Sequence, residues 1–461
     1  MNRLVPGNRG TQEMADETVR LATYAAQLRY EDIPAAVVQR AKDCITDTVA
    51  VIVQGNGLPW SQMIVAYAQR IGAGGRCRIL GAPGPTVQAP SAALANGTLA
   101  HAFESDNLTR PGAGVHPGAT LVPSALAIAQ ERGFGGRALI TAVVAGFEVM
   151  YRIGAATHHS NEQRGFHAPG TTGPFGAAVA CAHLLGLDAD GMTHALGIAG
   201  SCAGGLMEFA RSGTGAMVKR LHLGRAAESG VLAASLAAEG FTGPRSVIEG
   251  PAGFLQVFCN HSDPGELTRD LGEQFATMNL CLKRFPCHMS AHTAVQAVLE
   301  LREDHGFAGG DVDRVIVQGT ERMATINNIL DPADIMMAQY SIPFCVALAL
   351  FRDPRDPVSF EDSALRDAAI RTMCGRVTVT QADPPTRVAG ASIVTVLLKD
   401  GQSLTRTVEE FDGTPSRPLT RAALHDKFCT LARVRYGEAA AALFERLQNL
   451  EAETDLSWIG S

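Results

Sequence analysis

The sequence lacks the features that mark proteins binding nucleic acid or membranes. Charged residues make up only 18% of the 461 residues, the formal net charge is −7, and no basic run or aromatic-interleaved basic stripe occurs. Such a chain is poorly suited to neutralising a phosphate backbone. No uninterrupted apolar run reaches the roughly 18 residues of a membrane span. We therefore predict that the protein binds neither nucleic acid nor a membrane, and that its ligands are small molecules.

Motifs for metals and organic cofactors are also missing. The ten cysteines are scattered, and no two form C-x-x-C, which weighs against a zinc ribbon, a thioredoxin-like redox pair and a cysteine-ligated iron–sulfur cluster. Gly72, Gly74 and Gly75 do not form a G-x-G-x-x-G dinucleotide motif. The N-terminus has no apolar segment of signal-peptide length. The sequence thus predicts neither a metal nor a cofactor, and a cytoplasmic location.

The chain is instead rich in Ala, Gly and Leu, and 46% of its residues are hydrophobic. Its many helices carry few charged residues, so several faces of each must be buried against other helices or against a second copy of the chain. A homo-oligomer is therefore plausible. The composition changes at residues 263–267, where we place a domain boundary. Beyond it we expect strands at residues 314–319, 376–380, 393–398 and 403–408, the last two joined by a hairpin at residues 399–402. Ala- and Leu-rich helices return at residues 420–450 and should pack on the first domain.

A histidine precedes a helix in the segment R-G-F-H-A-P-G-T-T-G-P-F-G-A-A. His167 lies in a turn rich in Gly, Pro and Thr, and we expect the helix to start at residues 171–174, with Pro174 in its first turn. The amide groups and positive dipole end of such a helix favour a carboxylate or phosphate beside His167. The alternative is that His167 merely caps a buried helix.

The segment from residue 101 to residue 117 repeats this arrangement. His101, Glu104 and Asp106 follow a helix of small residues, and a Pro/Gly loop then brings His116 to the start of the next helix. Two helix ends could therefore direct their positive dipoles at one anionic ligand. The alternative is a solvated helix end followed by a capping histidine.

Cationic side chains gather in two later segments. Lys219 and His222 are three residues apart, so they share one face of a helix. Close to other cations, Lys219 would have a lowered pKa and act as a base, or stay charged and bind a carboxylate. The alternative is a surface face paired with acidic residues. The cations of this segment are Arg211, Lys219, Arg220, His222 and Arg225.

The second cationic segment, L-K-R-F-P-C-H, places Lys283, Arg284 and His288 before another helix. His288 and His292 have the spacing of a zinc-protease pair, but Met289 stands where the glutamate of H-E-x-x-H would be. A metal is therefore weakly supported here.

Several phrases together resemble the MmgE/PrpD family. They are G-F-H-A-P-G-T-T-G-P-F-G-A-A, V-K-R-L-H-L-G-R-A-A-E-S-G, L-K-R-F-P-C-H and A-Q-Y-S-I-P-F, preceded by A-H-A-F-E-S-D-N and V-H-P-G-A. The resemblance covers nearly the whole chain. It implies a mainly α fold with a large all-helical domain from residues 1–265 and 411–461, a smaller α+β lid from residues 266–410, and a homodimer with the active site between the domains.

The resemblance also implies the chemistry, because the family includes 2-methylcitrate dehydratase, cis-aconitate decarboxylase and iminodisuccinate epimerase, which act on small polycarboxylates without a metal or organic cofactor. The chain reads Glu104-Ser105-Asp106-Asn107 where relatives typically read D-F-D-D. The decarboxylase tyrosine falls on Phe344, although Tyr340 lies one helical turn away. The expected catalytic residues are His116, His167, Lys219, Lys283 and Asp106, and the expected substrate-binding residues are His288, Glu104, Tyr340 and Arg284.

These residues suit reactions at a carbon next to a carboxylate, where negative charge builds up. We expect Lys219 and Lys283 to stabilise that charge and His167 to abstract a proton. His116 with Asp106 would donate a proton, and His288 would orient the substrate. We predict a hydro-lyase that dehydrates a hydroxy acid similar to 2-methylcitrate. The alternatives are an isomerase, epimerase or decarboxylase on the same scaffold, and a catalytically silent protein that binds carboxylates.

Overall fold

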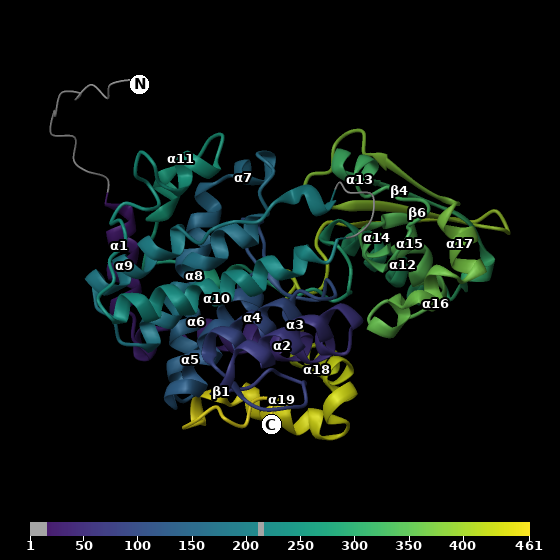
Figure 1. Cartoon of the computed structure of the whole chain (residues 1–461). Coiled ribbons are helices and arrows are strands. Elements are labelled where there is room, and N and C mark those ends of the chain that lie inside the picture. Colours follow the sequence, from purple (N-terminus) through teal and green to yellow (C-terminus); the bar gives the residue numbers. More distant parts are fainter. Residues whose placement is uncertain (1–15, 211–215) are drawn as a thin grey trace.

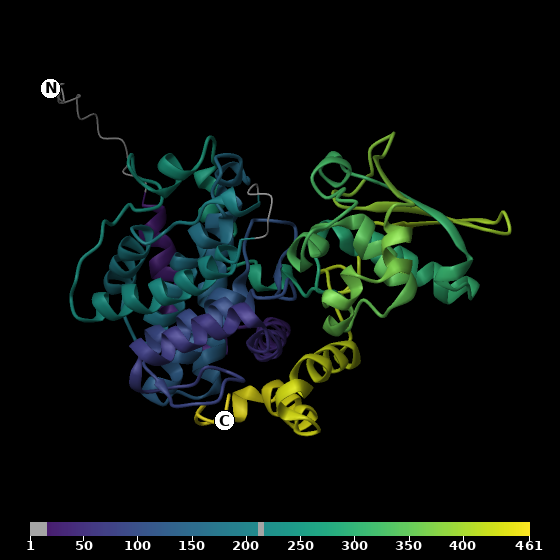
Figure 2. The ribbon, with the colours of Figure 1, turned by 45° about the vertical axis from the view of Figure 1, so that its right-hand side comes forward.

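The computed structural model describes residues 16–210 and 216–461. Arg211 and the segment used to predict the absence of a signal peptide lie outside these residues. The described chain is mainly helical, as predicted, and forms two bodies that lie side by side (Figures 1 and 2). The helical body comprises α1 (Glu17–Gln27), α2 (Ala35–Asn56), α3 (Pro59–Ile71), β1 (Ala73–Cys77), α4 (Ala89–Ala100), β2 (Leu108–Thr109), α5 (Pro117–Arg132), α6 (Gly136–Ala156), α7 (Ser160–Gln163), α8 (Ala168–Leu184), α9 (Ala189–Gly200), α10 (Val218–Ala238) and α11 (Phe254–Phe258).

The second body combines helices with a four-stranded sheet in the order β5-β4-β6-β7. Strands β4 and β5 are parallel, whereas β6 is antiparallel to both β4 and β7. The four expected strands and the hairpin at residues 399–402 are thus confirmed. Its elements, with the connecting strand β3 (Leu280–Cys281), are α12 (Met289–His305), β4 (Val312–Gly319), α13 (Glu321–Thr325), α14 (Ile335–Tyr340), α15 (Ile342–Phe351), α16 (Asp362–Leu365), α17 (Ala368–Cys374), β5 (Val377–Gln381), β6 (Ser392–Leu398) and β7 (Ser403–Val408).

The C-terminal helices α18 (Arg421–Tyr436) and α19 (Ala439–Gln448) return beneath the helical body, as Figure 2 shows in yellow. Phe428 and Phe444 belong to the hydrophobic core of that body. Lys427 on α18 also pairs with Asp47 on α2 at 2.5 Å. At its other side α18 contacts the α+β body through the ion pair of Arg433 with Asp356. The domain limits, and closure of the α+β body as a lid, stay predictions.

Helix α6 is the one described helix that is long and apolar enough to cross a membrane by length and composition. The core helix of a globular protein passes the same test, and 83% of its apolar window is buried inside the helical body. It also carries Glu148 and Arg152, which form a buried ion pair at 3.6 Å. Burial and this pair are the reasons to describe α6 as a core helix.

Small residues let α10 approach its neighbours α4 and α8 closely, and this approach positions the candidate site. A Cβ atom added at Gly224 of α10 would lie 2.1 Å from Thr98 Oγ1 and 2.4 Å from the backbone oxygen of Leu94, both on α4. Any side chain at Gly224 would therefore push α10 away from α4. Lys219 lies on α10, so its position depends on this contact.

The Gly224→Ala substitution should lower the free energy of unfolding by about 1–3 kcal/mol, because overpacking outweighs the gain in helix propensity. Urea unfolding followed by circular dichroism measures the change. Gly310→Ala is the matched control, since a Cβ there meets no atom within 4 Å. Equal stability of the two variants would contradict the importance of this contact.

Candidate active site

Glu104 is the centre of a buried polar cluster between the two bodies. One of its carboxylate oxygens accepts a hydrogen bond from Lys219 on α10, and the other lies 3.0 Å from Nζ of Lys283. Lys283 also donates to the backbone oxygen of Glu104 at 3.1 Å. All three side chains are nearly inaccessible to solvent. The two predicted lysines therefore meet on one carboxylate, although they are 64 residues apart in the sequence.

The backbone around Glu104 is held in an unusual conformation. Its φ angle is +57°, in the left-handed region that few residues other than glycine adopt. The preceding residue, Phe103, is buried in the core of the α+β body rather than in the helical one. Gln339 of α14 donates to the backbone oxygen of Phe103 at 2.9 Å. These contacts hold Glu104 against both lysines, and such strain is typical of functional sites.

Asp106 holds two histidines in the same cluster. Its Oδ2 atom lies 2.9 Å from Nδ1 of His101 and 2.7 Å from Nδ1 of His116. Both rings can donate to this carboxylate from Nδ1, so Nε2 of each ring is directed elsewhere. His101 is fully buried, whereas His116 is partly exposed. Lys283 reaches the other Asp106 oxygen at 4.0 Å.

His167 contacts a further histidine. Its Nδ1 atom lies 3.1 Å from Nδ1 of His222, which shares one face of α10 with Lys219. Phe209 lies against both rings, with its centroid 5.2 Å from that of His167. His167 is also within 6.1 Å of the ring of His101. The two helix-start histidines predicted to act together are thus in one cluster, and His101 lies between them.

The helix after His167 starts earlier than expected. Helix α8 begins at Ala168 instead of at residues 171–174, and Pro174 lies inside it. A proline cannot donate to the oxygen four residues before it, here Gly170. The backbone N–H of Gly204 donates to that oxygen instead, at 3.2 Å. His167 is therefore the residue directly before α8, beside the positive dipole end of that helix.

The α+β body contributes His288 and Tyr340 to the cluster. Their ring centroids are 4.6 Å apart, and Nζ of Lys219 lies 5.0 Å from the centroid of Tyr340. His288 also caps α12, because its side chain accepts from the backbone N–H of Ser290 at 3.4 Å. His288 and Tyr340, like His116 and His222, are only partly buried. The cluster thus has a buried floor and a more accessible rim with residues from both bodies.

The charged groups of the floor stabilise one another. Burial disfavours the charged form of each group. For Glu104 the attraction of Lys219 and Lys283 is larger than this effect, and it holds the pKa of Glu104 well below its usual value. Conversely, Glu104 outweighs burial and raises the pKa of both lysines. His101 and His116 likewise lower the pKa of Asp106 against the effect of burial. Lys219 therefore stays charged beside Glu104.

For the histidines the effect of burial is the larger one, because no comparable excess of negative charge lies beside them. It lowers the pKa of His101 to about 4, despite Asp106, and that of His288 to about 3. Burial and the nearby Lys219 hold the pKa of His167 well below its usual value. With these lowered pKa values, the three rings are neutral near pH 7.

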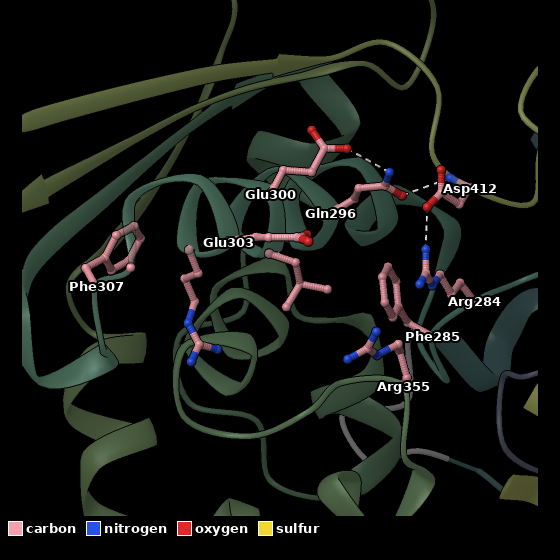
Figure 3. A pocket seen from close by; sticks show the side chains of 11 residues that line it. Arg284, Phe285, Gln296, Glu300, Glu303, Phe307, Arg355 and Asp412 are labelled. Atoms are coloured by element: carbon pink, nitrogen blue, oxygen red, sulfur yellow. Dashed lines mark hydrogen bonds and ion pairs between the residues drawn. The ribbon is translucent and has the colours of Figure 1, made fainter. Parts of the chain in front are cut away.

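Arg284 does not join the cluster. It follows Lys283 directly in the segment between β3 and α12. Its guanidinium pairs with Asp412 beside a separate cavity of about 620 Å³ in the α+β body (Figure 3). Phe285 and Arg355 line the same cavity. The structure thus separates Arg284 from the other eight predicted residues, which it brings together.

The cluster also contains a group of possible metal ligands. The ligand atoms of His101, Asp106 and His116 all lie within 4.8 Å of one another. Two imidazoles and a carboxylate are a donor set that zinc accepts. The short contacts from both rings to one carboxylate oxygen also fit a hydrogen-bonded proton-transfer group. The absence of a metal from the reaction stays a prediction.

The predicted site omitted three residues that the structure brings to the cluster: His101, His222 and Gln339. His222 shares a helix face with Lys219, and His101 precedes Asp106 by five residues in a polar segment. Both could have been included on those grounds. The contact of Gln339 with Phe103 has no comparable pattern, because it joins segments 236 residues apart.

Mild acid should destabilise the protein. His101 and His288 have pKa values of about 4 and about 3 when folded, compared with ~6.5 in an unfolded chain. The unfolded chain therefore binds more protons between these values, and the free energy of unfolding falls as the pH drops from about 6.5 toward about 4. Urea unfolding at a series of pH values measures this fall.

The His101→Asn variant is the matched comparison, since its amide can still donate to Asp106 but does not titrate. Its stability should fall less steeply over the same pH range. The depressed pKa values of Glu104 and Asp106 add their own loss only as the pH falls below about 4. Identical slopes for the wild type and the variant would contradict the assignment to His101.

Comparison with known proteins covers nearly all of the chain. Residues 19–267 match the MmgE/PrpD N-terminal domain, and residues 285–451 match the MmgE/PrpD C-terminal domain. The cis-aconitate decarboxylase-like protein oryM of Aspergillus oryzae is 29% identical over 466 residues, which cover 94% of this chain and 93% of the relative. The cis-aconitate decarboxylase of Homo sapiens is 28% identical, with 95% and 93% covered. That of Aspergillus terreus is also 28% identical, with 95% and 94% covered.

These relatives overturn one prediction. Decarboxylases are carboxy-lyases, which break a carbon–carbon bond, so the prediction of a hydro-lyase is wrong. The error arose because the lysine, histidine and carboxylate groups stabilise charge next to a carboxylate whichever group departs. The family resemblance itself is confirmed over both parts of the chain. The protein belongs to the MmgE/PrpD family.

Proposed function

We propose that the protein is a carboxy-lyase that releases CO2 from cis-aconitate, or from a closely similar unsaturated polycarboxylate, without a metal or organic cofactor. The single observation that carries the proposal is the buried cluster in which Lys219 and Lys283 share the carboxylate of Glu104 beside the Asp106–His116 pair. The decarboxylases to which the chain is similar over more than nine-tenths of its length support the choice of reaction.

The chemistry of this substrate class explains why cationic groups are needed. cis-Aconitate carries one carboxylate on each carbon of a propene chain. When the carboxylate on the CH2 carbon leaves as CO2, the electron pair of the broken bond forms a new double bond to the central carbon. The pair of the old double bond moves to the far carbon, which accepts a proton. Until it does so, the carboxylate on that carbon carries the extra charge.

Lys219 and Lys283 are the groups that stabilise this charge. Both are charged and buried, so their attraction for a substrate carboxylate is weakly screened. Glu104 holds them in place before the substrate arrives, which lowers the cost of reorganisation. The phenol of Tyr340 lies beside Lys219 and can hydrogen-bond to the same substrate carboxylate.

His116 is the proton donor in this proposal. Asp106 orients its ring by accepting from Nδ1, which leaves Nε2 directed away from Asp106. The ring belongs to the accessible rim, so it can recover a proton from solvent after each turnover. Decarboxylation requires no proton abstraction, so the base role expected for His167 has no place in this reaction.

Two departures from the family pattern have structural counterparts. Phe344, where the resemblance places a tyrosine, is buried in the core of the α+β body. Tyr340 takes its place beside Lys219 and His288. Glu104 replaces the shorter aspartate of the D-F-D-D motif and reaches both lysines. These changes alter the shape of the site, so the preferred substrate can differ from cis-aconitate in size.

Proton NMR and mass spectrometry in D2O test the reaction directly. The purified protein would be treated with chelator and incubated with cis-aconitate and other di- and tricarboxylates. Decarboxylation should release one CO2 and place one deuterium on the carbon that accepts the proton. Loss of water, or exchange without loss of carbon, would instead contradict the carboxy-lyase proposal. A homodimer and a cytoplasmic location stay predictions beside it.

The Lys219→Met variant should lose at least about 100-fold in kcat, because one charge-stabilising group is removed. Lys283 still pairs with Glu104 in this variant, so the protein should remain folded. CO2 release measures the effect on activity, and circular dichroism checks the fold. The matched control is Lys399→Met, which removes a solvent-exposed lysine from the β6–β7 hairpin. Full activity of the folded Lys219→Met protein would overturn the assigned role.

A further inference from the structure

The charges of the catalytic cluster cancel before a ligand arrives. Lys219 and Lys283 are balanced by Glu104 and Asp106, and the pKa values of these four groups keep all of them charged. Arg220 is directed to the backbone oxygen of Ala102 and the ring of Trp60. Arg322 lies close enough to add to burial in lowering the pKa of His288. The four charged groups at the centre of the site therefore offer a polycarboxylate two well-oriented lysines but no net positive charge of their own.

Binding an anion with several charges to such a site is costly. A buried charge without compensation is strongly disfavoured, and proteins commonly avoid this cost by changing a protonation state. The carboxylates already bound to the lysines cannot take up a proton easily, because their pKa values are depressed. The neutral histidines are the groups best able to supply compensating positive charge.

The pair formed by His167 and His222 is suited to this role. The 3.1 Å contact between their Nδ1 atoms holds a single proton when both rings are neutral. The donor ring then has a free lone pair on Nε2, and a proton added there leaves the contact between the rings intact. His167 is buried, whereas His222 is partly exposed and can exchange protons with solvent.

The packing around His222 fixes the geometry of the pair. A Cβ atom at Gly205, whose φ angle is +124°, would lie 3.0 Å from Nδ1 of His222. A Cβ atom at Gly170 would lie 3.3 Å from the Cβ of His222. The ring of Phe209 covers the pair from a third direction. The two rings therefore have little freedom to separate.

The charges facing the pair explain why it holds no extra proton in the free protein. Lys219 comes from the same helix as His222 and repels a proton on either ring. His101 and His116, from the segments after α4 and before α5, face His167 and add to this effect when they are protonated. Glu104 and Asp106 are already paired. A ligand carboxylate on Lys219 would cancel the main repulsion.

We infer that the His167–His222 pair takes up a proton when a polycarboxylate binds, and that this proton enters from solvent through His222. The inference rests on the proposed function for the class of ligand. It gives His167 a part that decarboxylation itself does not require. It also adds His222 as a positioning and proton-exchanging residue that acts through His167.

Isothermal titration calorimetry measures the proton uptake. The ligand is tricarballylate, the saturated analogue of cis-aconitate, which has no double bond to stabilise decarboxylation. Titrations near pH 7 in two buffers with different heats of ionisation give the number of protons bound per ligand. We expect between about 0.5 and 1 proton per site for the wild type, and a dissociation constant that rises up to about tenfold per pH unit above pH 7.

The His222→Gln variant should lose at least about half of this uptake, because its amide can contact His167 but does not titrate. The matched control is His305→Gln, which removes an exposed histidine at the end of α12 and should leave the uptake unchanged. Binding without proton uptake in the wild type would overturn the inference. Undiminished uptake in a folded His222→Gln protein would also overturn it.

A measurement on the wild type alone covers the case in which His222→Gln does not fold. With 15N-labelled histidine, the Nε2 resonances of His167 and His222 should change toward those of a protonated ring when tricarballylate is added. Unchanged resonances with ligand bound would refute the inference. CO2 release without proton uptake would leave the proposed function intact, whereas uptake without turnover of any polycarboxylate would remove the function and keep the inference. No binding of tricarballylate at any pH would overturn the inference, and CO2 release from cis-aconitate would decide the proposed function separately.

Discussion

The sharing of one buried carboxylate by two lysines is the constraint on which the rest of the structure depends. Glu104 neutralises Lys219 from a long helix and Lys283 from the segment that enters the α+β body. Removing Glu104 would leave two buried lysines without the carboxylate they share, which costs several kcal/mol, whereas removing one lysine leaves Glu104 paired with the other. Three features keep these groups together. They are the close packing of α10 on α4, the left-handed backbone of Glu104, and the hydrogen bond from Gln339 to the backbone of Phe103.

Much of the fold could be predicted from local patterns. The strands of the sheet alternate clearly, and helices such as α3 and α5 begin with a proline and end at a glycine. The start of α8 was placed too late, because an internal proline is normally unfavourable in a helix. Here an N–H from Gly204, which is distant in the sequence, compensates for the missing hydrogen bond. Such compensation by a tertiary contact cannot be recognised from a local pattern.

The candidate site could be predicted in composition but not in its pairings. Histidines before helix starts and lysines in charge-poor segments gave five of the residues that the structure brings together, and the acidic segment and the family resemblance gave Glu104, Asp106 and Tyr340. Arg284 was included because it is next to Lys283, yet its guanidinium pairs with Asp412 and does not join the cluster. The reaction was misassigned for a related reason. Stabilising negative charge beside a carboxylate is common to dehydration and decarboxylation, so the residues specify the charge rather than the leaving group.

The burial of Phe103 in the second core has a consequence for how the site can open. Its neighbour Glu104 belongs to the lysine cluster, so a segment of the helical body is embedded in the α+β body at the site itself. If the two bodies separate to admit a ligand, Phe103 must either leave its core or carry Glu104 with it. In the first case Glu104 stays with Lys219 of the helical body, and in the second case Lys219 loses its partner. Entry of a ligand from between the bodies would therefore disturb either the second core or the charged cluster.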